Sequence, residues 1–166
     1  QPLGKDIYPD AHSASLLPGK IVPGTVLAAE CCYGAELYDP AKTGGQAGIA
    51  YTYLGEGAYG VFGSTTIAYG PSSGNGAADL ICQYFMQQVK SGASLGLATL
   101  DARHQYAGQF SHLSPTDLKT LAQFYLLGDP SIHPVAIEPH GLNQTKAFQA
   151  AFAESKDAGV RSLRRA

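Results

Sequence analysis

Two adjacent cysteines stand where an apolar run of the sequence ends. Residues 25–34 read TVLAAECCYG, so that Glu30 directly precedes Cys31 and Cys32. A thiolate is a strong nucleophile, and backbone N–H groups at a strand end can lower a thiol pKa and receive an oxyanion. Cysteine is also among the most buried residue types, so a packing role is the competing interpretation. The stretch therefore indicates either a cysteine nucleophile or part of a core.

The apolar run itself predicts a strand that would carry these residues to the edge of a sheet. Residues 24–31 (GTVLAAEC) form a largely apolar run, as in a strand buried on both faces. Sites in open α/β sheets lie beyond the carboxyl ends of such strands. Because side chains alternate along a strand, one cysteine should face the site while the other packs inward. Gly34 would allow a sharp turn and a close approach of the backbone to a substrate.

The remaining sequence predicts helices that alternate with two further strands. Ser114 is a good helix N-cap, with Pro115 and Asp117 following in the first turn. This order of elements indicates a layered α/β fold with a mostly parallel sheet. The expected strands span 58–63 and 126–135, and the expected helices span 46–57, 77–91, 93–107, 115–125 and 144–158. We therefore expect an irregular lead-in over 1–23, a domain over 24–137 and a polar helical tail over 138–166.

Composition excludes several classes of function. With 166 residues, 45% hydrophobic and 14% charged, the chain can form one sizeable core. The net charge of −2 and the absence of a long apolar stretch argue against nucleic acid and membrane as partners. Three cysteines make no disulfide framework or metal cluster, so we expect free thiols, a reducing compartment, no metal and no cofactor. Because the chain begins with Gln1, we expect it to be a processed piece or an incomplete chain.

The motif Glu30-Cys31-Cys32-Tyr33-Gly34 resembles the nucleophile motif of caspase-like cysteine peptidases, the clan of caspases, legumains, metacaspases, clostripain and gingipains. Alignment with the caspase signature Q-A-C-R/Q/G-G puts Cys32 at the nucleophile. GVFGSTTIAYGP at 60–71 resembles the gingipain segment that follows the nucleophile. FYLLGDPSIHPV at 124–135 is similar to the ending of gingipain-like and bacterial caspase-like (CHAT) domains. The resemblance, over about 20–135, implies a caspase-like three-layer α/β/α sandwich, with this chain as its C-terminal part.

The resemblance implies a Cys-His dyad, in which the histidine shuttles the proton and an acyl-enzyme forms. The family histidine lies in a His-Gly pair on the preceding strand, about 50 residues upstream in caspases. The one upstream histidine here is His12, which is much nearer to Cys32 and is followed by Ser13. Either another segment of the same precursor supplies the His-Gly strand, or His12 is the partner in a shortened connection. The remaining histidines are expected at the surface or in loops: His104, His112, His133 and His140.

The resemblance also implies a substrate class, namely a protein or peptide with a basic residue before the scissile bond. In the legumain, clostripain and metacaspase branches, an acid two residues before the nucleophile lines the primary specificity pocket. Carried over, Glu30 would favour Arg or Lys there through charge pairing. Tyr69, with Ser64 and Thr65, matches the gingipain segment that forms a wall of that pocket. The alternative function is a catalytically inactive module of the same fold that serves regulation or binding.

Overall fold

A three-stranded sheet organises residues 12–136, the part of the chain that the computed structural model describes. The strands are β1 Val26–Ala29, β2 Gly60–Ser64 and β3 Phe124–Gly128, in the order β1-β2-β3. β1 and β2 are parallel, whereas β2 and β3 are antiparallel. The predicted α/β fold class is confirmed, and both strands that flank the cysteines lie close to their expected positions.

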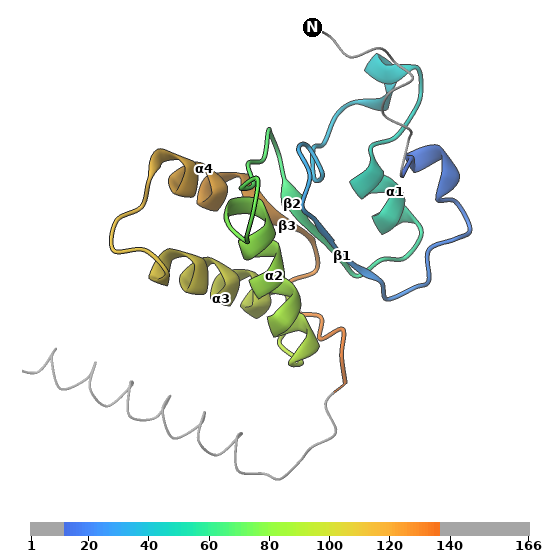
Figure 1. Ribbon diagram of the computed structural model, residues 1–166. Helices are drawn as coiled ribbons and strands as arrows, with labels where there is room; N and C mark the ends of the chain where they lie inside the picture. The colour runs from blue at the N-terminus through green and yellow to red at the C-terminus, as the bar shows by residue number, and fades with distance from the viewer. Residues whose placement is uncertain (1–11, 137–166) are drawn as a thin grey trace, which may run out of the picture. The chain divides into compact units, whose positions relative to one another are not determined.

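Helices cover both faces of this sheet. They are α1 Ile49–Gly55, α2 Ala77–Lys90, α3 Leu95–Gly108 and α4 Pro115–Gln123, with single 3₁₀ turns η1 Ala14–Leu16 and η2 Pro40–Thr43. Figure 1 shows α1 on one side of the strands and α2, α3 and α4 on the other, which makes three layers. No helix among residues 12–136 is long and apolar enough to cross a membrane. The helix expected over 144–158 lies outside the described residues.

Alternate residues of β2 enter two separate cores, one on each face. Phe62 stacks on Phe85 of α2 with the ring centroids 4.4 Å apart, in the core that α2 and α3 line. Val61 belongs to the core shared with α1. All residues of β2 are buried, because each face of the strand is covered by helices. A continuous apolar segment, rather than an alternating one, is the sequence pattern that such a strand requires.

The end of α4 differs from the expected helix over 115–125. The helix stops at Gln123, and β3 starts directly at Phe124. Phe124 is fully buried and its ring lies 5.8 Å from that of Phe62. The packing of Phe124 on β3 against Phe62 on the neighbouring strand β2 therefore determines where the helix stops. The start of α4 is as predicted, since Ser114 and Asp117 form a reciprocal capping box.

The segment after β3 packs against the start of α3. The N–H of Gly96 donates to the carbonyl of Pro130 at 2.9 Å, which satisfies a free donor of the first helical turn. A Cβ at Gly96 would lie 2.8 Å from the Pro130 Cβ, so the contact requires glycine. Asp129 accepts hydrogen bonds from the N–H and hydroxyl of Ser131, as expected of a turn residue. The Gly-Asp-Pro-Ser motif is therefore a structural joint.

Candidate active site

A turn directly after β1 carries the two adjacent cysteines. The strand ends at Ala29, and both Cys31 and Cys32 are exposed. The expectation that one of them packs inward is wrong, because the alternation of side chains stops where the strand stops. The sharpest backbone conformation in the turn belongs to Tyr33, whose φ of 59° lies in the left-handed region that few non-glycine residues adopt.

Hydrogen bonds with β2, with the loop after it and with β3 hold this turn. The N–H of Tyr33 donates to the carbonyl of Thr66 at 2.9 Å, and the N–H of Ala35 donates to the carbonyl of Ser64 at 3.0 Å. On the far side of the turn, the hydroxyl of Tyr125 on β3 donates to the carbonyl of Ala35 at 2.6 Å. The residues around the thiols are therefore fixed in position by β2, by the loop after it and by β3.

Gly34 has a packing role that the sequence did not indicate. The residue is buried, and its φ is not in the left-handed region. A Cβ on Gly34 would lie 2.6 Å from the Cβ of Ala29 and 3.1 Å from the sulfur of Cys31. Glycine is needed because the turn brings the chain back against the end of β1, and not because of an unusual conformation at Gly34.

The three thiols have different surroundings. Cys32 donates to the carbonyl of Ala68 at 3.5 Å and is exposed. Partial burial raises the pKa of the Cys31 thiol, and the neighbouring Cys32 raises it further. Burial in the core, chiefly, raises the pKa of Cys82 far above its usual value. Because the thiolate is the nucleophilic form, the buried Cys82 is disfavoured as a nucleophile at neutral pH.

Glu30, next to Cys31 in the chain, is influenced by a second carboxylate, that of Asp79. Loss of hydration raises the pKa of Glu30, and the negative charge of Asp79 at the start of α2 raises it further. Both carboxylates also raise the pKa of the Cys82 thiol, so all three groups share one region. Repulsion between two nearby carboxylates favours the arrival of a cation. Glu30 and Asp79 therefore give this part of the protein a negative charge.

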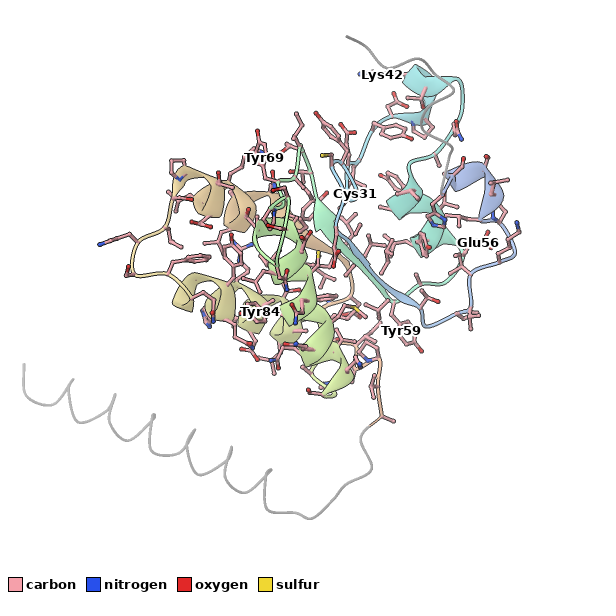
Figure 2. All side chains as sticks on the ribbon, in the orientation of Figure 1. Cys31, Lys42, Glu56, Tyr59, Tyr69 and Tyr84 are labelled. Atoms are coloured by element: carbon pink, nitrogen blue, oxygen red, sulfur yellow. The ribbon has the colours of Figure 1, made fainter. Side chains whose placement is uncertain are left out.

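The loop after β2 faces the turn from the other side. Ser64 is fully buried, and its hydroxyl donates to the carbonyl of Thr66 at 2.8 Å, so its side chain shapes the loop and does not face solvent. Thr65 is half-buried and its N–H donates to the carbonyl of Gln123. Tyr69 is 49% exposed. In Figure 2, Tyr69 and Cys31 lie toward the end of the sheet that is opposite Tyr59.

The histidine expected beside Cys32 is not among its contacts. His12 lies with its Nε2 atom 2.8 Å from the hydroxyl of Tyr53 on α1, and nothing in the structure joins it to Cys32. His104, His112 and His133 are exposed, as expected, and none of them contacts Cys32 either. His140 lies outside the described residues. Within residues 12–136, Cys32 therefore has no histidine partner.

One edge of β1 is open in the described part of the chain. β1 pairs with β2 along Val26–Ala29, and no other strand of residues 12–136 pairs with it. An unpaired edge presents backbone N–H and C=O groups to which a further strand can bond. No group of three or more metal-ligating side chains occurs between residues 12 and 136. The site thus consists of a thiol, carboxylates and backbone groups.

Several residues around the site had not been predicted from the sequence. They are Asp79, Lys119, Gln123 and Tyr125. Lys119 and Gln123 are four positions apart on α4, a spacing that places them on one helix face. Both side chains form hydrogen bonds with the loop after β2, which is distant from α4 in sequence. No local pattern therefore predicts these contacts.

Comparison with known proteins identifies the family. Residues 18–135 match the model of Peptidase family C25, the gingipain family of clan CD cysteine peptidases. Searches of curated proteins and of solved structures found no match. The matched range takes in β1, the cysteine turn, the loop after β2 and the Gly-Asp-Pro-Ser joint. The chain therefore belongs to Peptidase family C25, a family of cysteine peptidases, which are hydrolases of protein or peptide substrates.

Proposed function

We propose that Cys32 is the nucleophile of a cysteine endopeptidase that cleaves after Arg or Lys. The observation that carries this proposal is the exposed Cys32 thiol on a turn held from two sides, beyond the carboxyl end of β1. Alignment with the caspase signature puts the nucleophile at Cys32, and partial burial raises the pKa of the neighbouring Cys31 thiol. A fixed position matters for the reaction, since proximity and orientation supply a large part of the rate.

In the proposed reaction, the Cys32 thiolate attacks the scissile carbonyl carbon, and a C–S bond forms as the carbonyl oxygen becomes an oxyanion. The C–N bond then breaks, and the amine leaves with a proton from the histidine. Water cleaves the resulting thioester and releases the acid. The N–H groups of Tyr33 and Ala35 already donate within the protein. The N–H groups of Cys32 and Gly34 are therefore the oxyanion donors that we propose on this turn.

The open edge of β1 supports the proposal that a further strand of the same precursor supplies the histidine. Carboxyl ends of neighbouring parallel strands meet at one edge of a sheet, so a histidine ending such a strand would lie near Cys32. His12 is instead engaged with Tyr53. In the precursor that includes this further strand, replacing His12 by alanine should leave peptide cleavage intact. Loss of cleavage in a folded His12→Ala variant would make His12 the partner.

The carboxylates next to the thiol support a basic specificity. Loss of hydration, chiefly, and the charge of Asp79 raise the pKa of Glu30, and a substrate Arg or Lys would offset both effects by pairing with this carboxylate. Tyr69 and Thr65 would line the same pocket from the opposite loop, with Ser64 holding that loop in place. A charged hydrogen bond contributes about 1.5–3 kcal/mol, which corresponds to roughly 10–100-fold in kcat/KM.

The nucleophile is tested with paired variants and a peptide library. Cys32→Ala should lower cleavage at least ~1,000-fold. Cys31→Ala, the matched control one residue away, should keep most of the activity. Loss of cleavage in Cys31→Ala alone would move the nucleophile by one residue. Inactivity of the precursor that includes the histidine-bearing segment would favour a catalytically inactive module, the second candidate, which the lack of a histidine contact to Cys32 within residues 12–136 supports.

The specificity is tested with Glu30→Gln against Glu36→Gln, an exposed acid on the same turn. The wild-type protein should cleave after Arg or Lys. The kcat/KM of the Glu30 variant should fall roughly 10–100-fold on these substrates and should change little on substrates with a neutral residue at that position. The Glu36 variant should behave as the wild type. A wild-type preference for Asp before the scissile bond would refute the assigned role of Glu30.

A further inference from the structure

The ammonium group of Lys119 on α4 is held by several neutral acceptors. Its Nζ atom donates to the hydroxyl of Thr66 at 3.0 Å, to the side-chain oxygen of Gln123 at 2.5 Å, and to the carbonyl of Ile67. It also lies 5.2 Å from the centroid of the Tyr69 ring, within cation–π range. A lysine is usually solvated and loses considerable rotamer entropy when fixed. This lysine is fixed on residues 65–69, which we call the 65–69 segment.

The 65–69 segment in turn contacts the cysteine turn. The carbonyl of Thr66 accepts from the N–H of Tyr33, and the carbonyl of Ala68 accepts from the thiol of Cys32. Lys119 binds Ile67 and the side chain of Thr66. The same short segment therefore connects the lysine of α4 with the proposed nucleophile.

Gln123 holds the segment from the side of α4. Its side-chain oxygen accepts from the hydroxyl of Thr66 at 2.7 Å and from Lys119, and its main-chain carbonyl accepts from the N–H of Thr65. The side chain is buried, and its Nε2 has no partner within the described residues. An unpaired buried donor costs about 1–3 kcal/mol. The two hydrogen bonds that the same side chain accepts through its oxygen, from Thr66 and Lys119, offset this cost.

We propose that Lys119 is a positioning residue of the peptidase. By fixing the 65–69 segment on α4, it sets where the Ala68 carbonyl meets the Cys32 thiol and where Tyr69 stands beside the site. Lys119 acts through this segment and does not contact the substrate. The catalytic consequence rests on the proposed function of Cys32, whereas the ordering of the segment does not.

The first test measures the segment directly and needs no activity. Lys119→Met removes the charge and the donors but keeps most of the aliphatic stem, and Lys119→Arg restores a cation. Lys20→Met, at an exposed lysine in a turn, is the matched control. Amide hydrogen exchange is followed at Tyr33 and Thr65. The N–H of Tyr33 donates to the carbonyl of Thr66 in the segment, and the N–H of Thr65, within the segment, donates to the carbonyl of Gln123. Ala98, bonded within α3 at 2.8 Å, reports global stability.

Lys119→Met should speed exchange at Tyr33 and Thr65 by at least ~10-fold and leave Ala98 unchanged, because only local opening becomes easier. Lys119→Arg and Lys20→Met should match the wild type at both sites. Unchanged exchange at Tyr33 and Thr65 in Lys119→Met would overturn the proposal. Equal acceleration at Ala98 would also overturn it, since Lys119 would then stabilise the whole fold.

The second test separates positioning from general damage. Lys119→Met should lower kcat/KM on a basic peptide by roughly 10–100-fold, because small displacements at the reacting atoms are costly. Alkylation of Cys32 by iodoacetamide needs no substrate pocket, so its rate should change far less than kcat/KM. Lys119→Arg should rescue cleavage. Wild-type cleavage by Lys119→Met would refute the proposal. If the precursor that includes the histidine-bearing segment cleaves nothing, the proposed function of Cys32 is refuted, whereas the exchange measurement still tests the role of Lys119.

Discussion

Replacing Gly34 by alanine should loosen the turn that carries Cys32. The new Cβ would lie 2.6 Å from the Cβ of Ala29, whereas ordinary contacts begin at 3.4 Å. The two chain segments must therefore separate by roughly 1 Å. Because Cys31 and Cys32 lie between these two positions, the separation displaces the thiol. Overpacking of this kind costs about 1–3 kcal/mol, and a displacement of about 1 Å can cost ~100-fold in rate.

The assay combines urea unfolding with kcat/KM on a basic peptide. Gly34→Ala should lose about 1–3 kcal/mol of unfolding free energy and roughly 10–100-fold of activity. Gly108→Ala is the control, because a Cβ at the end of α3 meets nothing within 4 Å. The Gly108→Ala variant should keep its activity, and its unfolding free energy should rise by up to about 1 kcal/mol, since alanine favours the helix.

A second substitution tests whether the contact itself is responsible. Ala29→Gly removes the partner atom, so the double variant Ala29→Gly/Gly34→Ala should recover part of the lost stability and activity. Recovery will be incomplete, because the sulfur of Cys31 would still lie 3.1 Å from the new Cβ. A double variant no better than the sum of the single effects would refute the reasoning, as would a Gly34→Ala variant that behaves as the wild type.

Three further predictions concern the elements that support the site. Gly128→Ala should lower the unfolding free energy by at least ~2 kcal/mol in urea unfolding, because φ is 137° and the new Cβ would lie 2.4 Å from a main-chain oxygen. Tyr125→Phe should cost about 1 kcal/mol in the same assay, because the Ala35 carbonyl loses its donor. Ser114→Ala should cost about 1 kcal/mol at pH 7. Hydrogen bonds from Ser114, chiefly, hold the pKa of Asp117 below its ordinary 3.8, so this stabilisation is present above about pH 4 and is lost as pH falls through the lowered pKa. Thermal unfolding of the wild type and of Ser114→Ala from pH 7 to 3 should show the difference between their Tm values shrinking. A difference in Tm that stays constant with pH would contradict the role assigned to Asp117.

Local sequence signals predicted much of the fold. The apolar segment of β2 predicted a strand because helices cover both of its faces. The apolar run before the cysteines also forms a strand, β1, but the expectation that it is buried on both faces is wrong, because three of its four residues are only half-buried. The capping box at Ser114 was predictable because its partners lie three residues apart. The end of α4 was not, because the burial of Phe124 against Phe62 depends on residues distant in sequence. The same holds for the joint between Gly96 and Pro130, whose contact appears only once the chain has folded.

The candidate site was predicted only in part. The family resemblance pointed to Cys32, and the structure adds that its turn is exposed and held in place. The alternation rule failed for Cys31 because it was extended beyond the end of β1. The pairing of His12 with Tyr53, and the contacts of Lys119, join segments far apart in sequence. Spacing along the chain carries no information about such contacts.

Labelling of the thiols tests the central claim most directly. The active protein is treated with a peptide that carries Arg next to a thiol-reactive ketone, and the modified cysteine is identified by peptide mass spectrometry. The account predicts a single adduct on Cys32, which free Arg peptide should slow by competition. Labelling of Cys31 in place of Cys32, or labelling of Cys32 no faster than of denatured protein, would contradict the assignment of the nucleophile.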